Sequence, residues 1–199
     1  LDTALKLNTD VYASYKSAFP YDSFYVKFFR LNSNIFLRTA NYDTALQTDL
    51  DFLKLAESKK DTSGMVAATM GIGNVSNKLN KTEEALKWYY AALDLMQNDV
   101  YKRKFCFIYN NIAIAHYKLS NKDSMIFFVR KGLVYSKQSG NLTDYANSLL
   151  LYGGMLAEDN QLTLAENAFK EGLEERKKIG DIYYIINDMA QFALFYLNT

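Results

Sequence analysis

The chain has 199 residues, of which 49% are hydrophobic and 23% charged, as in an ordinary globular protein. Its formal net charge of +1 excludes the strongly basic field that nonspecific nucleic-acid binding requires. A single cysteine excludes an internal disulfide, and a single proline favours long helices.

The sequence repeats itself every 40 residues, and the segments 32–45, 72–85, 112–125 and 152–165 follow one plan. Repetition at a fixed period of this size indicates a stack of similar structural units. Three columns define the register: small residues at Ser33, Gly73, Ala113, Gly153 and Ala193; Ala45, Ala85, Met125 and Ala165; and Leu53, Leu93, Leu133 and Leu173.

In chain order, this register predicts a second helix of a preceding repeat over 1–19, repeats of two helices over 20–59, 60–99, 100–139 and 140–179, and the first helix of a following repeat over 180–199. Apolar residues spaced three and four apart, as in 83–96, indicate amphipathic helices. We expect Thr82 or Asn121 to cap the second helix of its pair, and Gly140 and Gly180 to end helices in the left-handed conformation.

These residues resemble the tetratricopeptide repeat. Gly73, Ala85, Tyr89 and Ala92 follow its pattern of small residue, alanine, aromatic and small residue, and Gly153, Ala165, Phe169 and Gly172 do the same. The chain departs from the pattern at Met125 and at Phe52, and Asp49 and Val129 replace the second aromatic. Its period of 40 exceeds the usual period of about 34.

Repeats of this length resemble those of bacterial signalling proteins, where they precede a histidine kinase or a helix-turn-helix domain. The resemblance implies an all-α, right-handed superhelical solenoid of about ten antiparallel helices, forming one domain over 1–199. It also implies a non-catalytic sensor or interaction domain that binds a protein or peptide. We expect the chain to be a fragment of a larger bacterial signalling or regulatory protein. The alternative is a structural scaffold that self-associates and binds no signal.

No catalytic, cofactor or metal site is expected. His116 is the single histidine, and its column is shared with residues that pack between helices, so we interpret it as a packing residue. Cys106 lies ten residues away on the same predicted helix, about 15 Å along the axis, too far to share a metal with His116. The segment "GIGN" (71–74) lacks the strand and the lysine of a phosphate-binding loop.

In the tetratricopeptide family, the first helices of successive repeats line a concave groove that holds the partner. The corresponding positions here are rich in asparagine and basic residues, which suit an acidic peptide or a terminal carboxylate. The alternative is that these polar residues only solubilise a helix face. The candidate groove residues are Lys27, Arg30, Asn34, Arg38, Met70, Asn74, Asn77, Lys78, Phe107, Asn110, Tyr117, Lys118 and Asn147, with Gly154, Ala157, Glu158 and Leu194 in the same columns.

Chaperone-tail adaptors of this family clamp a terminal carboxylate with a fixed set of basic and asparagine residues. Arg30 and Asn34 match the first pair, but Gly71, Phe107 and Asn111 stand where the remaining clamp residues belong, so that function is excluded. We expect no nucleic-acid partner. We also expect no membrane span, because 183–197 is too short and too polar. The sequence predicts neither the oligomeric state nor whether the compartment is the cytoplasm or the periplasm.

Overall fold

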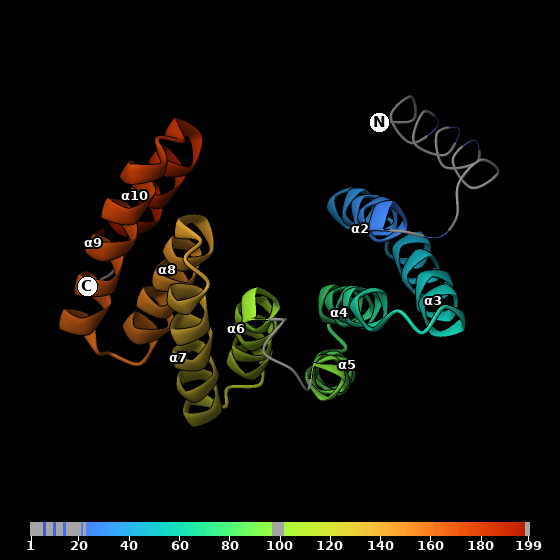
Figure 1. Ribbon diagram of the computed structural model, residues 1–199. Helices are drawn as coiled ribbons and strands as arrows, with labels where there is room; N and C mark the ends of the chain where they lie inside the picture. The colour runs from blue at the N-terminus through green and yellow to red at the C-terminus, as the bar shows by residue number, and fades with distance from the viewer. Residues whose placement is uncertain are drawn as a thin grey trace. The chain divides into compact units, whose positions relative to one another are not determined.

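The computed structural model describes Lys6, Asp10, Ser14, Tyr21, 23–96 and 102–197. The described part of the chain is all-helical (Figure 1), which confirms the predicted all-α class. The helix expected over 1–19 lies outside the described residues, apart from three single positions. The helices are α2 (Ser23–Arg38), α3 (Tyr42–Ser58), α4 (Thr62–Lys78), α5 (Thr82–Leu95), α6 (Lys102–Lys118), α7 (Lys122–Gln138), α8 (Leu142–Glu158), α9 (Leu162–Ile179) and α10 (Ile182–Leu197).

Contacts divide the chain into two compact units, 1–97 and 98–199. Unit 1 contains α2 to α5 and unit 2 contains α6 to α10. In each unit, helices that follow one another in the chain pack side by side (Figure 1). A single solenoid over 1–199 stays a prediction.

The first helices of the repeats, α2, α4, α6, α8 and α10, also contact one another within each unit. Helix α2 packs on α4, α6 on α8, and α8 on α10. The second helices α3, α5, α7 and α9 make no such contact with one another within a unit, among the residues described. The first helices therefore form the inner side of each unit, which is the side that the sequence analysis assigned to the groove.

Helices end at a left-handed residue that recurs every 20 positions within the described segments. The left-handed conformation at Gly140 and Gly180 confirms the prediction for both glycines. At the non-glycine ends, the following backbone N–H donates to the carbonyl five residues back, as from Asn121 to His116 at 2.9 Å. This bond offsets the cost of a left-handed L-residue, roughly 1–2 kcal/mol. The non-glycine residues concerned are Ala40, Lys60, Asn80, Ser120 and Asn160.

The predicted N-cap residues agree with the structure in one case of two. The Asn121 side chain accepts a hydrogen bond from the Ser124 backbone N–H at 3.3 Å and caps α7, as expected. Thr82 does not act as a cap, because α5 already begins at this residue and the N-cap is Lys81. Among the described helices, α8 is capped in the same way as α7, by Asn141.

Each helix pair packs through a residue on its first helix and the residue 16 positions later on its second helix. A Cβ on Gly73 would lie 2.6 Å from the Tyr89 ring, so only glycine leaves room for that ring. Gly153 faces Phe169 less tightly, since a Cβ there would lie 3.2 Å from the ring. Larger residues on the first helix face smaller partners: Ser33 bonds Asp49, and Ala113 shares a core cluster with Val129. The departures from the family pattern at Asp49 and Val129 are therefore matched by the residues that they face.

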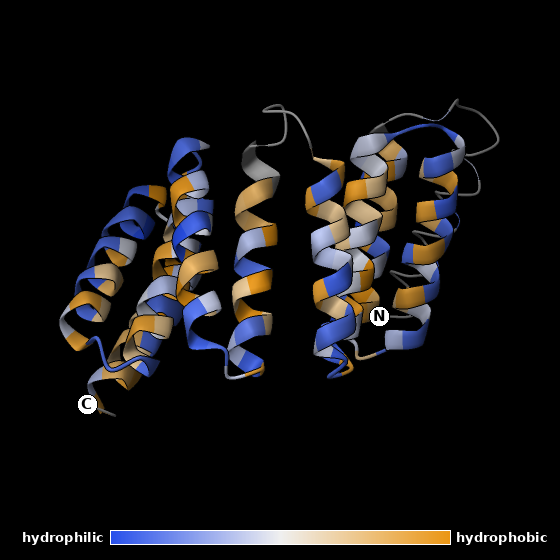
Figure 2. Ribbon diagram, turned by 90° about the horizontal axis from the view of Figure 1, so that it is seen from below, coloured by the Kyte–Doolittle hydropathy of each residue, from blue (hydrophilic) through white to orange (hydrophobic). Residues whose placement is uncertain are grey.

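The core of each unit lies between the helix layers. In unit 1, Phe28, Phe29, Phe52, Ala56 and Ala68 form one cluster, with the rings of Phe29 and Phe52 stacked at 4.7 Å. Figure 2 shows hydrophobic and hydrophilic segments alternating along the helices, as expected of amphipathic elements. No described helix has both the length and the apolar character needed to cross a bilayer.

Candidate functional site

The inner side of unit 1 is basic. Helices α2 and α4 carry four cations and no acidic residue, whereas α3 and α5 carry seven acidic residues, four and three respectively, and two lysines. All four cations are exposed, and none forms an ion pair within the described part of the chain. We call this surface the α2–α4 basic face; its cations are Lys27, Arg30, Arg38 and Lys78.

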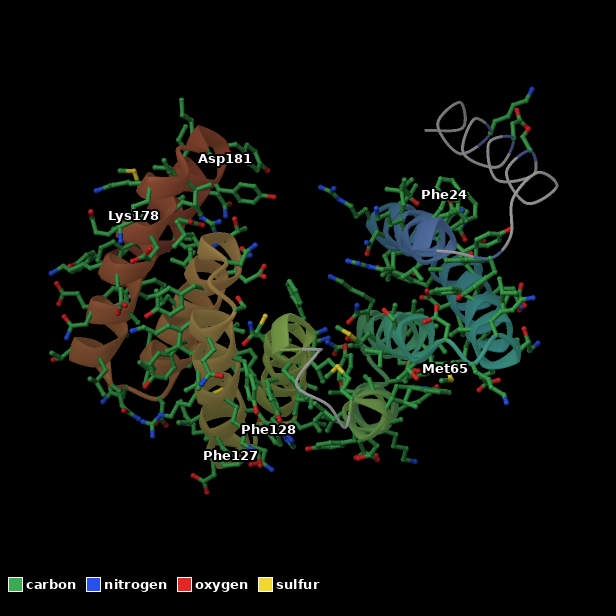
Figure 3. The ribbon with its side chains drawn as sticks, viewed as in Figure 1. Phe24, Met65, Phe127, Phe128, Lys178 and Asp181 are labelled. Atoms are coloured by element: carbon green, nitrogen blue, oxygen red, sulfur yellow. The ribbon has the colours of Figure 1, made fainter. Side chains whose placement is uncertain are left out.

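Helical geometry places these side chains together. Residues 27, 34 and 38 lie within about 20° of one line along α2, with Arg30 beside that line. Helix α2 packs on α4, which contributes Lys78. Asn34 is exposed on the same stripe, whereas Met70 and Asn77 are half-buried. Figure 3 shows several nitrogen-tipped side chains that project from α2 and α4. The structure thus brings the unit 1 candidates onto neighbouring helices.

Three asparagines of the predicted groove already bond within the chain. Asn74 accepts a hydrogen bond from the Tyr89 hydroxyl at 2.9 Å, and burial raises the pKa of that hydroxyl. The Asn110 Nδ2 donates a hydrogen bond to Ser148 Oγ at 2.9 Å, and the Asn110 Oδ1 lies against Gly132. Asn147 accepts from Arg176 at 2.5 Å. These three amides join neighbouring helices, so a bound peptide would have to compete with internal partners for them.

In unit 2, groove positions surround a hollow of about 590 Å³ between α8, α9 and α10. Gly154, Ala157, Glu158 and Leu194, all expected in the groove, lie in its wall. A Cβ built on Gly154 has no other atom within 4 Å, so the hollow is open at this position. The remaining wall residues were not predicted from the sequence; they are Asn160, Leu162, Phe169, Gln191 and Phe195. Phe107, Tyr117 and Lys118 are exposed on α6.

A buried ionic network joins α8, α9 and α10. The Arg176 Nε donates to Asp188 Oδ2 at 2.6 Å, and these side chains are 1% and 3% exposed. The guanidinium also lies over the Tyr184 ring, 5.0 Å from its centroid. Arg176 and Asp188 belong to two columns of the 40-residue register that are 12 residues apart. The first column contains Ala56, Met96, Ser136 and Arg176, and the second contains Ala68, Ile108, Ser148 and Asp188. The members of each pair are both apolar, both serine, or oppositely charged. This joint change in two columns is the sequence signal for the network, which was not predicted.

A second buried carboxyl group lies inside unit 1. Asp49 is 2% exposed, accepts a hydrogen bond from Ser33 Oγ at 2.6 Å, and packs against Gly71. Burial raises the pKa of this carboxyl to about 7, although the Ser33 hydrogen bond acts to lower it. Asp49 therefore titrates near neutral pH.

His116 packs between helices, as predicted. Its ring stacks on Phe128 with centroids 5.5 Å apart and planes at 6°, and burial lowers its pKa. Cys106 is buried. Within the described segments, no group of three or more His, Cys, Asp or Glu side chains is arranged to hold a metal ion.

The chain matches no protein-family model, and no curated protein matches its sequence. Solved structures do resemble it. A signal transduction ATPase with numerous domains, with a tetratricopeptide repeat sensor, from Pyrococcus horikoshii aligns over the whole chain at a TM-score of 0.74 and 13% identity. The chain spans 30% of that protein.

Two further structures share the fold. BtubC (BKLC) from P. vanneervenii aligns over 90% of this chain and 74% of its own, at a TM-score of 0.71 and 15% identity. The MamA RS-1 ArsTM double mutant aligns over 87% of this chain and 96% of its own, at a TM-score of 0.52 and 13% identity. At these identities the likeness establishes a helical repeat fold similar to that of a tetratricopeptide repeat sensor.

Proposed function

We propose that the chain is a non-catalytic interaction domain that binds an acidic segment of a partner protein on the α2–α4 basic face. The observation that carries this proposal is the set of four exposed cations on two neighbouring helices that contain no acidic residue. A carboxylate bound there gains charge-assisted hydrogen bonds, and Arg30 and Arg38 offer bidentate geometry. The acidic second helices of unit 1 repel the same ligand.

The likeness to a tetratricopeptide repeat sensor supports a place for this domain in a larger signalling or regulatory protein. Rigid helices suit such a role, because they hold the cations at fixed spacing and reduce the entropy lost on binding. The exposed Asn34 adds a carboxamide that both donates and accepts hydrogen bonds. Bacterial origin and the sensor role are parts of this proposal.

The test is a selection of peptides from a random library on the 199-residue chain. We expect the enriched peptides to be rich in Asp and Glu and to bind less tightly as salt rises, because exposed charges are screened. Replacing Lys27, Arg30 and Arg38 together by glutamate should weaken binding at least tenfold, which corresponds to roughly 1.4 kcal/mol. Isothermal titration calorimetry measures this loss.

The matched control is Lys54→Glu, which reverses one exposed cation on the second helix α3. It should leave peptide affinity within about twofold of the unaltered chain, and circular dichroism should show all variants folded. Selected peptides without acidic residues, or equal binding by the triple variant, would show that the basic face is not the binding surface.

A second candidate function is self-association through α10. This helix exposes large apolar side chains along its length, and such surfaces commonly mark contacts with another chain. Those more than half exposed are Ile182, Tyr183, Ile186, Met189, Leu194, Tyr196 and Leu197.

Sedimentation equilibrium tests this second candidate. A scaffold should show dimers or larger species that grow with concentration, and Ile186→Asp should dissociate them, because it places a charge in the contact. A chain that stays monomeric at all concentrations excludes self-association.

A further inference from the structure

Helix α7 differs from the other second helices on its outer side. Phe127 and Val134 are 53% and 52% exposed. The register supplies an internal comparison, because the equivalent residues elsewhere are all polar and exposed. They are Gln47, Lys87 and Asn167 in the Phe127 column, and Lys54, Asp94 and Glu174 in the Val134 column.

These two apolar side chains both line a hollow of about 420 Å³ along α7. Its wall consists of Asp123, Ile126, Phe127, Arg130, Lys131, Val134 and Tyr135, which form one stripe of the helix. Phe127 and Val134 are seven residues apart, or about 10 Å along the axis. Two turns of a partner helix cover the same distance, so apolar residues at i and i+7 of that helix meet both side chains.

The basic side chains of this face indicate the charge of the partner. Arg130 and Lys131 are exposed between the two apolar residues, and neither forms an ion pair with a carboxylate in the described residues. Helix α7 carries four basic residues and one acidic residue. Asp123 is also exposed in the wall of the hollow. The four basic residues of α7 outweigh this one carboxylate, so the face attracts acidic groups of a partner.

The aromatic residues are held in place from within unit 2. The Lys131 ammonium lies 4.6 Å from the Phe127 ring centroid and 5.4 Å from that of Tyr109. Phe128 stacks on Tyr109 and His116 of α6. The Phe127 ring meets the Phe128 ring edge to face, with centroids 5.1 Å apart, and this contact reduces the side-chain entropy that Phe127 loses on binding.

We infer that this face of α7 docks an acidic amphipathic helix of a partner protein, with Phe127 and Val134 as apolar contacts and Arg130 and Lys131 as anchors for its carboxylates. This surface is independent of the α2–α4 basic face, since it lies on a second helix of unit 2 and uses apolar burial as well as charge. Binding at one site can therefore be tested independently of binding at the other.

The test uses a fluorescein-labelled synthetic helix with leucines at i, i+4 and i+7 and glutamates on both flanks. A second peptide carries lysine in place of every glutamate. Titrations by fluorescence anisotropy use the 199-residue chain with Lys27→Glu, Arg30→Glu and Arg38→Glu, so that the basic face does not take up the probe. We expect binding of the acidic peptide and none of the basic one.

Phe127→Asn, which installs the residue of the same column in α9, should weaken binding about tenfold, and Arg130→Gln with Lys131→Gln should do the same. Lys122→Gln, an exposed cation of α7 outside the hollow, is the matched control and should change affinity less than twofold. Because these side chains make only surface contacts, the thermal unfolding midpoint should fall by no more than a few degrees, and every variant should stay folded during the titration.

Several results would overturn the inference. They are equal binding of both peptides, unchanged affinity in Phe127→Asn, or no binding of the acidic peptide at millimolar protein. Capture of the chain by phosphatidylglycerol vesicles that Phe127→Asn abolishes would assign the face to a membrane instead. Concentration-dependent self-association abolished by Phe127→Asn would assign it to a second copy.

Discussion

Arg176→Met should destabilise unit 2 by about 3–5 kcal/mol, because it leaves the buried Asp188 carboxylate without its counter-charge. The Arg176 side chain is 1% exposed and contacts Asp188, Asn147 and Tyr184, so water cannot readily replace it. Urea unfolding followed by circular dichroism measures the loss as a lower midpoint.

A double variant separates the cost of an unpaired charge from that of lost packing. Arg176→Met with Asp188→Leu removes both charges and should recover most of the stability lost in the single variant. Lys170→Met is the surface control: its pair with Glu166 lies at the surface, so the urea midpoint should hardly change. If Arg176→Met and Lys170→Met cost the same, the ionic network does not stabilise unit 2.

The second large effect is a pH dependence from Asp49. Burial raises its pKa to about 7, so at intermediate pH the folded chain holds a proton that the unfolded chain has released. The free energy of unfolding therefore falls as pH rises from about 4 through about 7. With an unfolded pKa of about 3.9, the loss between pH 5 and pH 8 is about 3 kcal/mol.

Asp49→Asn supplies the comparison, because the amide keeps the shape of the carboxyl and can accept the Ser33 hydrogen bond without titrating. Urea midpoints at pH 5 and pH 8 should differ much less in Asp49→Asn than in the unaltered chain. His116 titrates in both proteins and cancels from the difference. Equal pH dependence in the two proteins would mean that Asp49 is ionised when folded.

The fold was predictable because its determinants are local and repeat every 40 residues. Left-handed ends at Gly140 and Gly180, the Asn121 cap and the packing of His116 all follow from position within one repeat. Side-chain direction was less predictable. Asn74 and Asn110 occupy groove columns, yet their amides bond Tyr89 and Ser148, since a column identifies a helix face and does not specify a rotamer.

The buried charges were missed for a related reason. In the sequence, Asp49 is only a departure from the family pattern. The structure shows the reason for it, because Ser33 donates a hydrogen bond to its carboxyl group and Gly71 leaves room for that group. Arg176 lies in a run of exposed Glu and Lys residues on α9, which resembles a solvated helix face in sequence. Its burial depends on Asp188, which becomes its neighbour only after α9 and α10 pack together.

The central claim is that the inner, basic side of unit 1 receives acidic groups of a partner. Zero-length carbodiimide cross-linking tests it most directly, because it joins a carboxylate to a lysine only where the two already touch. With an acidic peptide selected on the 199-residue chain, mass spectrometry should find cross-links at Lys27 of α2 and Lys78 of α4. Cross-links concentrated instead at Lys54 of α3 and Lys87 of α5, which are equally exposed on the second helices, would contradict the claim.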